Sequence, residues 1–173
     1  MSSDTPLLHA IETYQQGEVE SALEAMQEIL LAEPHNPQVR IEFANMLMRE
    51  KRFDDARSLL DSLSVEDKAN PEALALIGQL ESIDTVMSAP DIDELLADIK
   101  KDQYNCLARE QLSAHYKLRG DYVAAMDQLL EIVRQDRNYN EQAGRTELLK
   151  IFELLGQHEL VGPYRKKLAQ LLN

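Results

Sequence analysis

The sequence has few of the residues that build disulfides, metal centres and membrane spans. Cys106 is its one cysteine, so the chain can form no internal disulfide and no Cys-x-x-Cys redox or zinc pair. No apolar run approaches the about 18 residues that a membrane helix needs, and no signal-peptide pattern opens the chain. Lys and Arg number only 18 against 31 Asp and Glu. These absences argue against a nucleic-acid or membrane partner and predict a cytoplasmic protein.

Strand-forming residues are also scarce. Val, Ile and Thr together number 20, whereas Leu, Ala, Glu and Gln together number 74. The second group consists of good helix formers and the first of residues that favour strands. Apolar residues recur at spacings of three and four, and few windows alternate with a period of two. The sequence therefore predicts an all-α protein.

A helix–turn–helix pattern returns along the chain. Ala22, Ala56 and Ala125 each follow a short turn, and the turns before the first and last begin at Gly17 and Gly120. The first two alanines are 34 residues apart and the last two 69, which is two periods plus one. A small residue soon after a tight turn is what two closely crossing helices need. This pattern resembles the tetratricopeptide repeat (TPR).

The TPR resemblance implies a right-handed superhelix of about five helical hairpins, or about ten helices, forming a single domain over residues 1–173. Asn36-Pro37 and Asn70-Pro71 supply helix start signals, and Ala89-Pro90-Asp91 should interrupt the third hairpin. The expected hairpins are 5–32, 37–63, 71–101, 105–136 and 140–172. The expected helices within them are 5–16, 18–32, 37–50, 52–63, 71–87, 91–101, 105–118, 121–136, 140–155 and 158–172.

The second half of the chain carries a narrower resemblance. The run GDYVAAMDQLLEIVRQD at 120–136 is followed by LLKIFELLG at 148–156 and closes on YRKKLAQLL at 164–172. This order is similar to the C-terminal TPR region of the YbbN-type thioredoxin-like proteins, or chaperedoxins. The resemblance implies a bacterial cytoplasmic co-chaperone without cofactors. Its partners would be unfolded client proteins and chaperones, with a chaperonin among the candidates.

One departure from that family concerns its thioredoxin domain. The family carries this domain ahead of the TPR region, whereas no strand pattern or Cys-x-x-Cys precedes Leu7 here. We expect either a truncated repeat region or a stand-alone relative, and truncation is the favoured alternative. Any redox activity would belong to the thioredoxin domain.

The sequence offers no residue constellation for catalysis. Its histidines, His9, His35, His115 and His158, include no pair at the i, i+4 spacing of a helical zinc site. No phosphate-binding loop or dinucleotide fingerprint is present, and no nucleophile–base arrangement supports a hydrolase. The sequence therefore predicts a protein that is not an enzyme and needs no metal or cofactor. The alternative to a co-chaperone is a TPR adaptor that binds one defined peptide in a regulatory or assembly complex.

The first candidate binding surface is the concave face, which the TPR resemblance places on the first helix of each hairpin. Without basic residues, this face should suit an amphipathic or extended apolar segment. The alternative is that its isoleucines are core residues. In the binding interpretation, an Ile41→Glu/Met48→Glu double variant should fold but lose its clients. The expected lining residues are Leu8, Ile11, Gln38, Ile41, Asn45, Met48, Gln79 and Ile83.

The second candidate surface is the closing helix. Its apolar residues form one stripe at spacings of three and four, beside the densest basic cluster in the sequence. Either the stripe seals the last hairpin as a terminal cap, or the helix docks on a partner chaperone. The residues concerned are Tyr164, Arg165, Lys166, Lys167, Leu168, Leu171 and Leu172.

Overall fold

The computed structural model describes residues 4–173, which contain eleven α-helices and no strand. The prediction of an all-α, TPR-like fold is thus confirmed, with one helix more than expected. Two compact units divide the chain within α6: the N-terminal unit, Met1–Ile77, and the C-terminal unit, Gly78–Asn173. The helices are α1 (Asp4–Gln15), α2 (Val19–Ala32), α3 (Pro37–Arg49), α4 (Phe53–Asp61), α5 (Val65–Lys68), α6 (Pro71–Met87), α7 (Ile92–Lys101), α8 (Cys106–Leu118), α9 (Tyr122–Gln135), α10 (Tyr139–Leu155) and α11 (Val161–Leu172).

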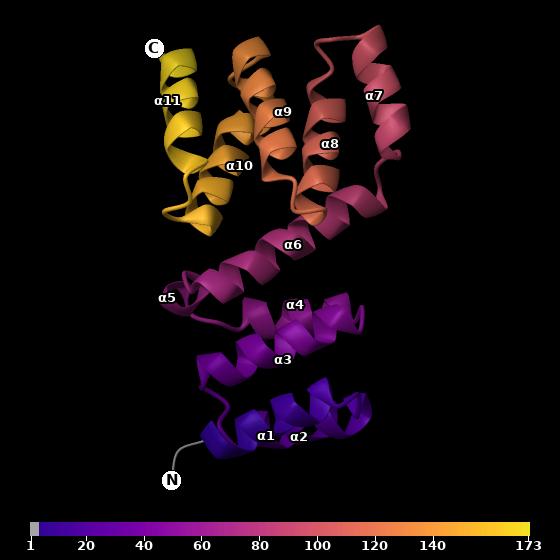
Figure 1. Ribbon diagram of the computed structural model, residues 1–173, viewed down its shortest axis with the longest axis vertical. Coiled ribbons are helices and arrows are strands. Elements are labelled where there is room, and N and C mark those ends of the chain that lie inside the picture. Colours follow the sequence, from indigo (N-terminus) through magenta and orange to yellow (C-terminus); the bar gives the residue numbers. More distant parts are fainter. Residues whose placement is uncertain (1–3) are drawn as a thin grey trace. The chain divides into compact units, whose positions relative to one another are not determined.

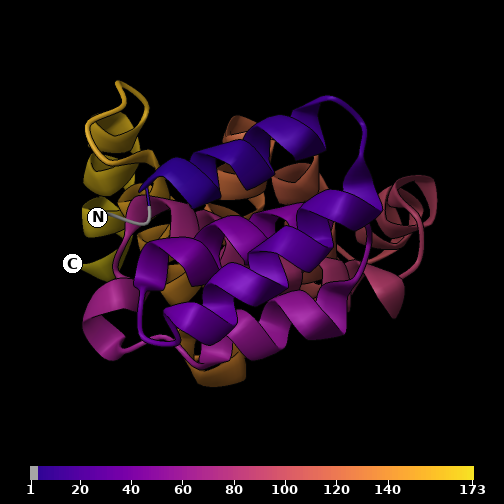
Figure 2. The same cartoon turned by 90° about the horizontal axis from the view of Figure 1, so that it is seen from below.

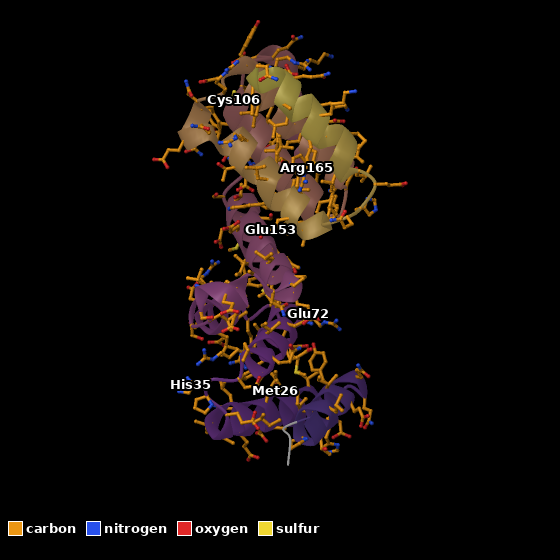
Figure 3. The ribbon with its side chains drawn as sticks, turned by 90° about the vertical axis from the view of Figure 1, so that its left-hand side faces the viewer. Met26, His35, Glu72, Cys106, Glu153 and Arg165 are labelled. Carbon is orange, nitrogen blue, oxygen red and sulfur yellow. The ribbon has the colours of Figure 1, made fainter. Side chains whose placement is uncertain are left out.

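The N-terminal unit is built from two helical hairpins, α1–α2 and α3–α4, which can be followed in Figure 2. Ala22 and Ala56 are fully buried, as the close crossing of paired helices requires. Met26 is also fully buried, whereas His35 lies at the surface; both are labelled in Figure 3. The repeat positions read from the sequence therefore occupy the interior of this unit.

Side-chain caps begin several helices. The Gln38 N–H donates to Asn36 Oδ1 at 3.0 Å, and the Glu72 N–H donates to Asn70 Oδ1 at 2.8 Å. The additional helix, α5, is a single turn in the connection between α4 and α6. Ser64 caps it, accepting from the Asp67 N–H at 3.1 Å. A Ser three residues before an Asp is a helix-start signal, so Ser64 and Asp67 mark this turn in the sequence.

The C-terminal unit packs around α9, which contacts α8, α10 and α11 (Figure 1). The apolar residues of α9 recur at helical spacing and are buried against the neighbouring helices. The core of this unit consists of Cys106, Ala125, Met126, Leu129, Leu130, Ile132, Val133, Leu148, Ile151, Phe152, Val161, Tyr164 and Leu168. A smaller cluster of Leu95, Ala108 and Leu112 joins α7 to α8.

The crossing of α9 and α10 is close because Gly144 has no side chain. A Cβ atom placed there would lie 3.0 Å from the Leu129 carbonyl oxygen and 3.0 Å from Val133 Cγ2. The backbone oxygen cannot move away as a flexible side chain could. Gly144 therefore sets the distance at which α10 packs on the core.

The first turn of α10 departs from the predicted helix. Asn140, Glu141 and Gln142 have φ angles of 43°, 54° and 66°, in the left-handed region. For residues with a Cβ this conformation costs about 1–2 kcal/mol each. The last helix also begins later than expected, at Val161 instead of residue 158. Local turn signals did not indicate either feature.

We expect Gln142→Gly to raise the free energy of unfolding by about 1 kcal/mol, because glycine adopts positive φ without the Cβ penalty. Chemical denaturation followed by circular dichroism would measure this. The matched control is Glu153→Gly, at an exposed and right-handed position of the same helix (Figure 3). The control should lower stability by about 1 kcal/mol. Destabilisation by both variants would contradict the left-handed turn.

Candidate protein-binding groove

A groove in the C-terminal unit is lined by α6, α8, α9 and α10. The polar and charged lining residues come from helices far apart in sequence, and two apolar side chains complete the lining. The lining residues are Glu81, Thr85, Glu110, Ser113, Ala114, Lys117, Leu129, Glu147 and Lys150.

The spacing of residues on α8 explains which side chains reach the groove. Glu110, Ala114 and Lys117 are separated by four and three residues and therefore share one helix face. Ser113, at the edge of this face, is buried and donates its hydroxyl to the Ala125 carbonyl oxygen at 3.2 Å. Leu112, on another face, packs in the cluster shared with α7. The Ser113 hydroxyl is therefore already hydrogen-bonded. The charged residues Glu110 and Lys117 stand at the two ends of the α8 face.

A chain of ion pairs runs across one end of the groove. Lys117 Nζ lies 2.7 Å from Glu147 Oε2, and Glu147 Oε1 lies 3.0 Å from Lys150 Nζ. Lys150 Nζ in turn lies 2.9 Å from Glu81 Oε2. The Lys117–Glu147 pair is largely shielded from water, with side chains 17% and 20% exposed, and should be the strongest member of the chain.

These contacts shift the pKa values of the two central residues. Burial disfavours the charged form of Glu147, but its ion pairs with Lys117 and Lys150 prevail and lower its pKa. Burial likewise opposes the charge of Lys150, but its contacts with Glu81 and Glu147 prevail and raise its pKa. The ion-paired charges are therefore a fixed part of the groove.

Glu110, at the other end of the α8 face, accepts hydrogen bonds from neutral donors. The Tyr139 hydroxyl donates to Glu110 Oε2 at 2.9 Å, and Asn140 Nδ2 donates to Glu110 Oε1 at 3.2 Å. Burial raises the pKa of Tyr139, and the hydrogen bond and negative charge of Glu110 raise it further. Asn140 makes this contact from within the left-handed turn of α10.

The residues predicted for the concave face fall in different environments. Ile41 and Met48 are buried, at 2% and 6% exposure, so their side chains cannot reach a partner. The Ile41→Glu/Met48→Glu variant is consequently expected to unfold, contrary to the expectation from sequence, because it would bury two carboxylates. Three of the other predicted residues, Leu8, Gln38 and Gln79, are exposed. The remaining three, Ile11, Asn45 and Ile83, are half-buried.

The residues predicted on the closing helix separate into a buried and an exposed set. Tyr164 and Leu168 belong to the core of the C-terminal unit, and Leu171 packs against it. The Tyr164 hydroxyl also donates to Asp127 Oδ1 at 2.6 Å. These contacts are those of a terminal cap. The exposed set consists of Arg165, Lys166, Lys167 and Leu172.

Sequence reasoning missed the charged groove. Its lining residues lie in the third to fifth hairpins, whereas the residues predicted for the concave face ended at Ile83. The usable signal was the expected fourth hairpin, 105–136, whose first helix closes on Tyr116-Lys117 before the Gly120 turn. The TPR resemblance places the concave face on the first helix of each hairpin, and α8 is the first helix of the fourth. Including α8 would have found Glu110 and Lys117, but not their partners on α10.

The rest of the described chain offers little other chemistry. Within residues 4–173, no three His, Cys, Asp or Glu side chains gather to hold a metal ion. Burial, followed by the nearby charge of Asp136, raises the pKa of the Cys106 thiol, which disfavours the reactive thiolate. Among these residues no helix is both long and apolar enough to cross a membrane.

Paired helices joined by tight turns, with small residues at the crossings, define a helical-repeat protein. Tetratricopeptide repeat models match residues 13–80 and 85–173. The chain belongs to the tetratricopeptide repeat family, which confirms the broader of the two resemblances. It is therefore a protein–protein interaction module.

Individual relatives are distant. Over 110 residues the chain is 31% identical to cellulose synthase operon protein C of Pseudomonas fluorescens (strain SBW25), a match covering 56% of this chain and 9% of that protein. A domain of protein VP0806 of Vibrio parahaemolyticus, of unknown function, is 23% identical with a TM-score of 0.44, covering 98% of this chain and 99% of that one. The thermophilic TPR protein TTC0263 of Thermus thermophilus is 14% identical with a TM-score of 0.47, covering 99% of each chain.

Proposed function

We propose that the groove of the C-terminal unit binds a segment of a partner protein. The observation that carries this proposal is the convergence of polar and charged side chains from α6, α8 and α10 on one hollow surface. Leu107 and Leu118, at 55% and 37% exposure, lie on the same side of α8 as Ala114, because they are seven and four residues from it. The surface thus combines apolar contact area with charges that fix orientation.

We further propose that the chain is the interaction region of a thioredoxin-like bacterial co-chaperone acting in the cytoplasm. The similarity of residues 120–172 to the chaperedoxins supports this role. The partners would be unfolded clients and chaperones, with a chaperonin among the candidates. The exposed apolar residues on α8 suit clients that offer apolar segments.

A second candidate function is that of an adaptor for one defined peptide. The charged lining favours it, because each ion-paired side chain in a groove discriminates against sequences that cannot match it. A surface for many unrelated clients would instead be expected to be flexible and apolar. The two functions therefore predict different ranges of partners.

Assays of partner range separate the two functions. A co-chaperone should suppress the aggregation of three unrelated denatured enzymes, monitored by light scattering, whereas an adaptor should enrich one peptide family from a random library. In either case, Leu107→Ser/Leu118→Ser should weaken binding at least about tenfold, because it removes exposed apolar contact area. The control Leu31→Ser/Leu96→Ser changes two exposed leucines on other helices, α2 and α7. Unchanged binding by the α8 variant would contradict a contribution of this apolar face beside the groove.

A further inference from the structure

We infer that Glu110 makes the groove selective for a partner segment that presents a lysine or arginine side chain. This inference rests on the proposed binding function of the groove. Three glutamates line the groove, and Glu110 has a different environment from Glu81 and Glu147, which are paired with lysines.

The charges lining the groove do not cancel. Lys117 and Lys150 are held by Glu147 and Glu81, so two cations balance two anions. Glu110 is the remaining charged lining residue, and it has no ion pair with any described residue. The unmatched charge of the groove is therefore negative.

Glu110 lies away from the two lysines that line the groove. Glu110 and Lys117 are seven residues apart on α8, which corresponds to about 10 Å along the helix axis. Glu147, not Glu110, lies within 2.7 Å of Lys117. A ligand cation at Glu110 would thus face an anion at one end of the groove, without competing with the ion pairs at the other.

Neutral donors hold the Glu110 carboxylate without neutralising it. Tyr139 and Asn140 each donate one hydrogen bond to it, at 2.9 and 3.2 Å, and a weaker contact joins Asn140 Nδ2 to Oε2 at 3.4 Å. A carboxylate has about four acceptor positions, so further donors can be accommodated. Because these hydrogen bonds already orient Glu110, its side chain would lose less conformational entropy when a partner binds.

A cationic side chain is the group that this site fits best. A half-buried carboxylate attracts a cation more strongly than one in water, and ammonium or guanidinium groups also supply the missing donors. An acidic partner side chain would instead be repelled by Glu110 and would find both lysines occupied. The exposed Leu107, one turn before Glu110, suits an apolar residue beside the basic one.

Selection of random twelve-residue peptides against the wild type, Glu110→Gln and Glu159→Gln tests this inference. Glu110→Gln keeps an acceptor for Tyr139 and Asn140 while removing the charge. Glu159→Gln removes the same charge from an exposed turn position outside the groove lining. Circular dichroism would verify that the variants fold. The best wild-type peptide, and its version with norleucine in place of the basic residue, would then be titrated by fluorescence anisotropy.

We expect the wild type and Glu159→Gln to enrich one basic position, which Glu110→Gln should no longer enrich. The norleucine peptide should bind the wild type about tenfold more weakly than the parent, but bind Glu110→Gln as the parent does. Enriched peptides without a basic position, or with one that persists in Glu110→Gln, would overturn the inference while leaving the groove a binding site. A selection that enriches no peptide would overturn the proposed function as well.

Discussion

Replacing Ala56 by arginine is expected to lower the free energy of unfolding by at least about 3 kcal/mol. Ala56 is fully buried where α3 and α4 pair in the N-terminal unit. An arginine there would overpack the crossing and bring a cation into an apolar interior. Urea denaturation followed by circular dichroism would measure the loss.

The matched control for this variant is Ser58→Arg. Ser58 lies on the same helix, two residues from Ala56, but it is exposed. The control should stay within about 0.5 kcal/mol of the wild type. Near-wild-type stability of Ala56→Arg would contradict the burial of this face of α4 and the placement of the second hairpin.

Deleting residues 168–173 is expected to abolish cooperative folding of the C-terminal unit. The deletion removes Leu168, whose loss from a core costs about 2–5 kcal/mol by itself. It also removes Leu171, which packs on that core and whose carbonyl oxygen accepts from Arg137 at 3.2 Å. Thermal unfolding followed by circular dichroism would show a broad, low-temperature transition.

A shorter deletion of residues 172–173 controls for the loss of the chain end. Leu172 is 36% exposed and lies outside the core, so the transition should remain cooperative. If the longer deletion folds normally but no longer captures a chaperone, the closing helix is a docking element. If it folds normally and its partners are unchanged, neither the cap nor the docking hypothesis holds.

Local patterns were sufficient to predict most of the fold. The spacing of Ala22, Ala56 and Ala125 identified three fully buried crossings. The Ala89-Pro90-Asp91 segment does separate α6 from α7, with Asp91 capping α7 by accepting from the Glu94 N–H at 3.0 Å. These features depend on residues close in sequence, so periodicity and capping rules describe them well.

The features that were missed depend on tertiary contacts. The left-handed turn at Asn140–Gln142 contradicts the preference of its own residues and is accompanied by the contact between Asn140 and Glu110. The pairing of Lys150 with Glu81 joins residues 69 positions apart. Neither can be inferred from helical periodicity alone, since periodicity gives the face of a helix but not the helix opposite.

The ion-paired end of the groove has a consequence for its behaviour across pH. The pKa of Glu147 is lowered from its ordinary value of 4.5, and that of Lys150 is raised from 10.5. The stabilisation from Glu147 is therefore lost only as the pH falls below 4.5, and that from Lys150 only as it rises above 10.5. The nine described lining residues include no histidine. Glu147 and Lys150 thus keep their charges throughout neutral pH, so the ion-paired end of the groove should hold the same charges in mildly acidic and mildly alkaline solution.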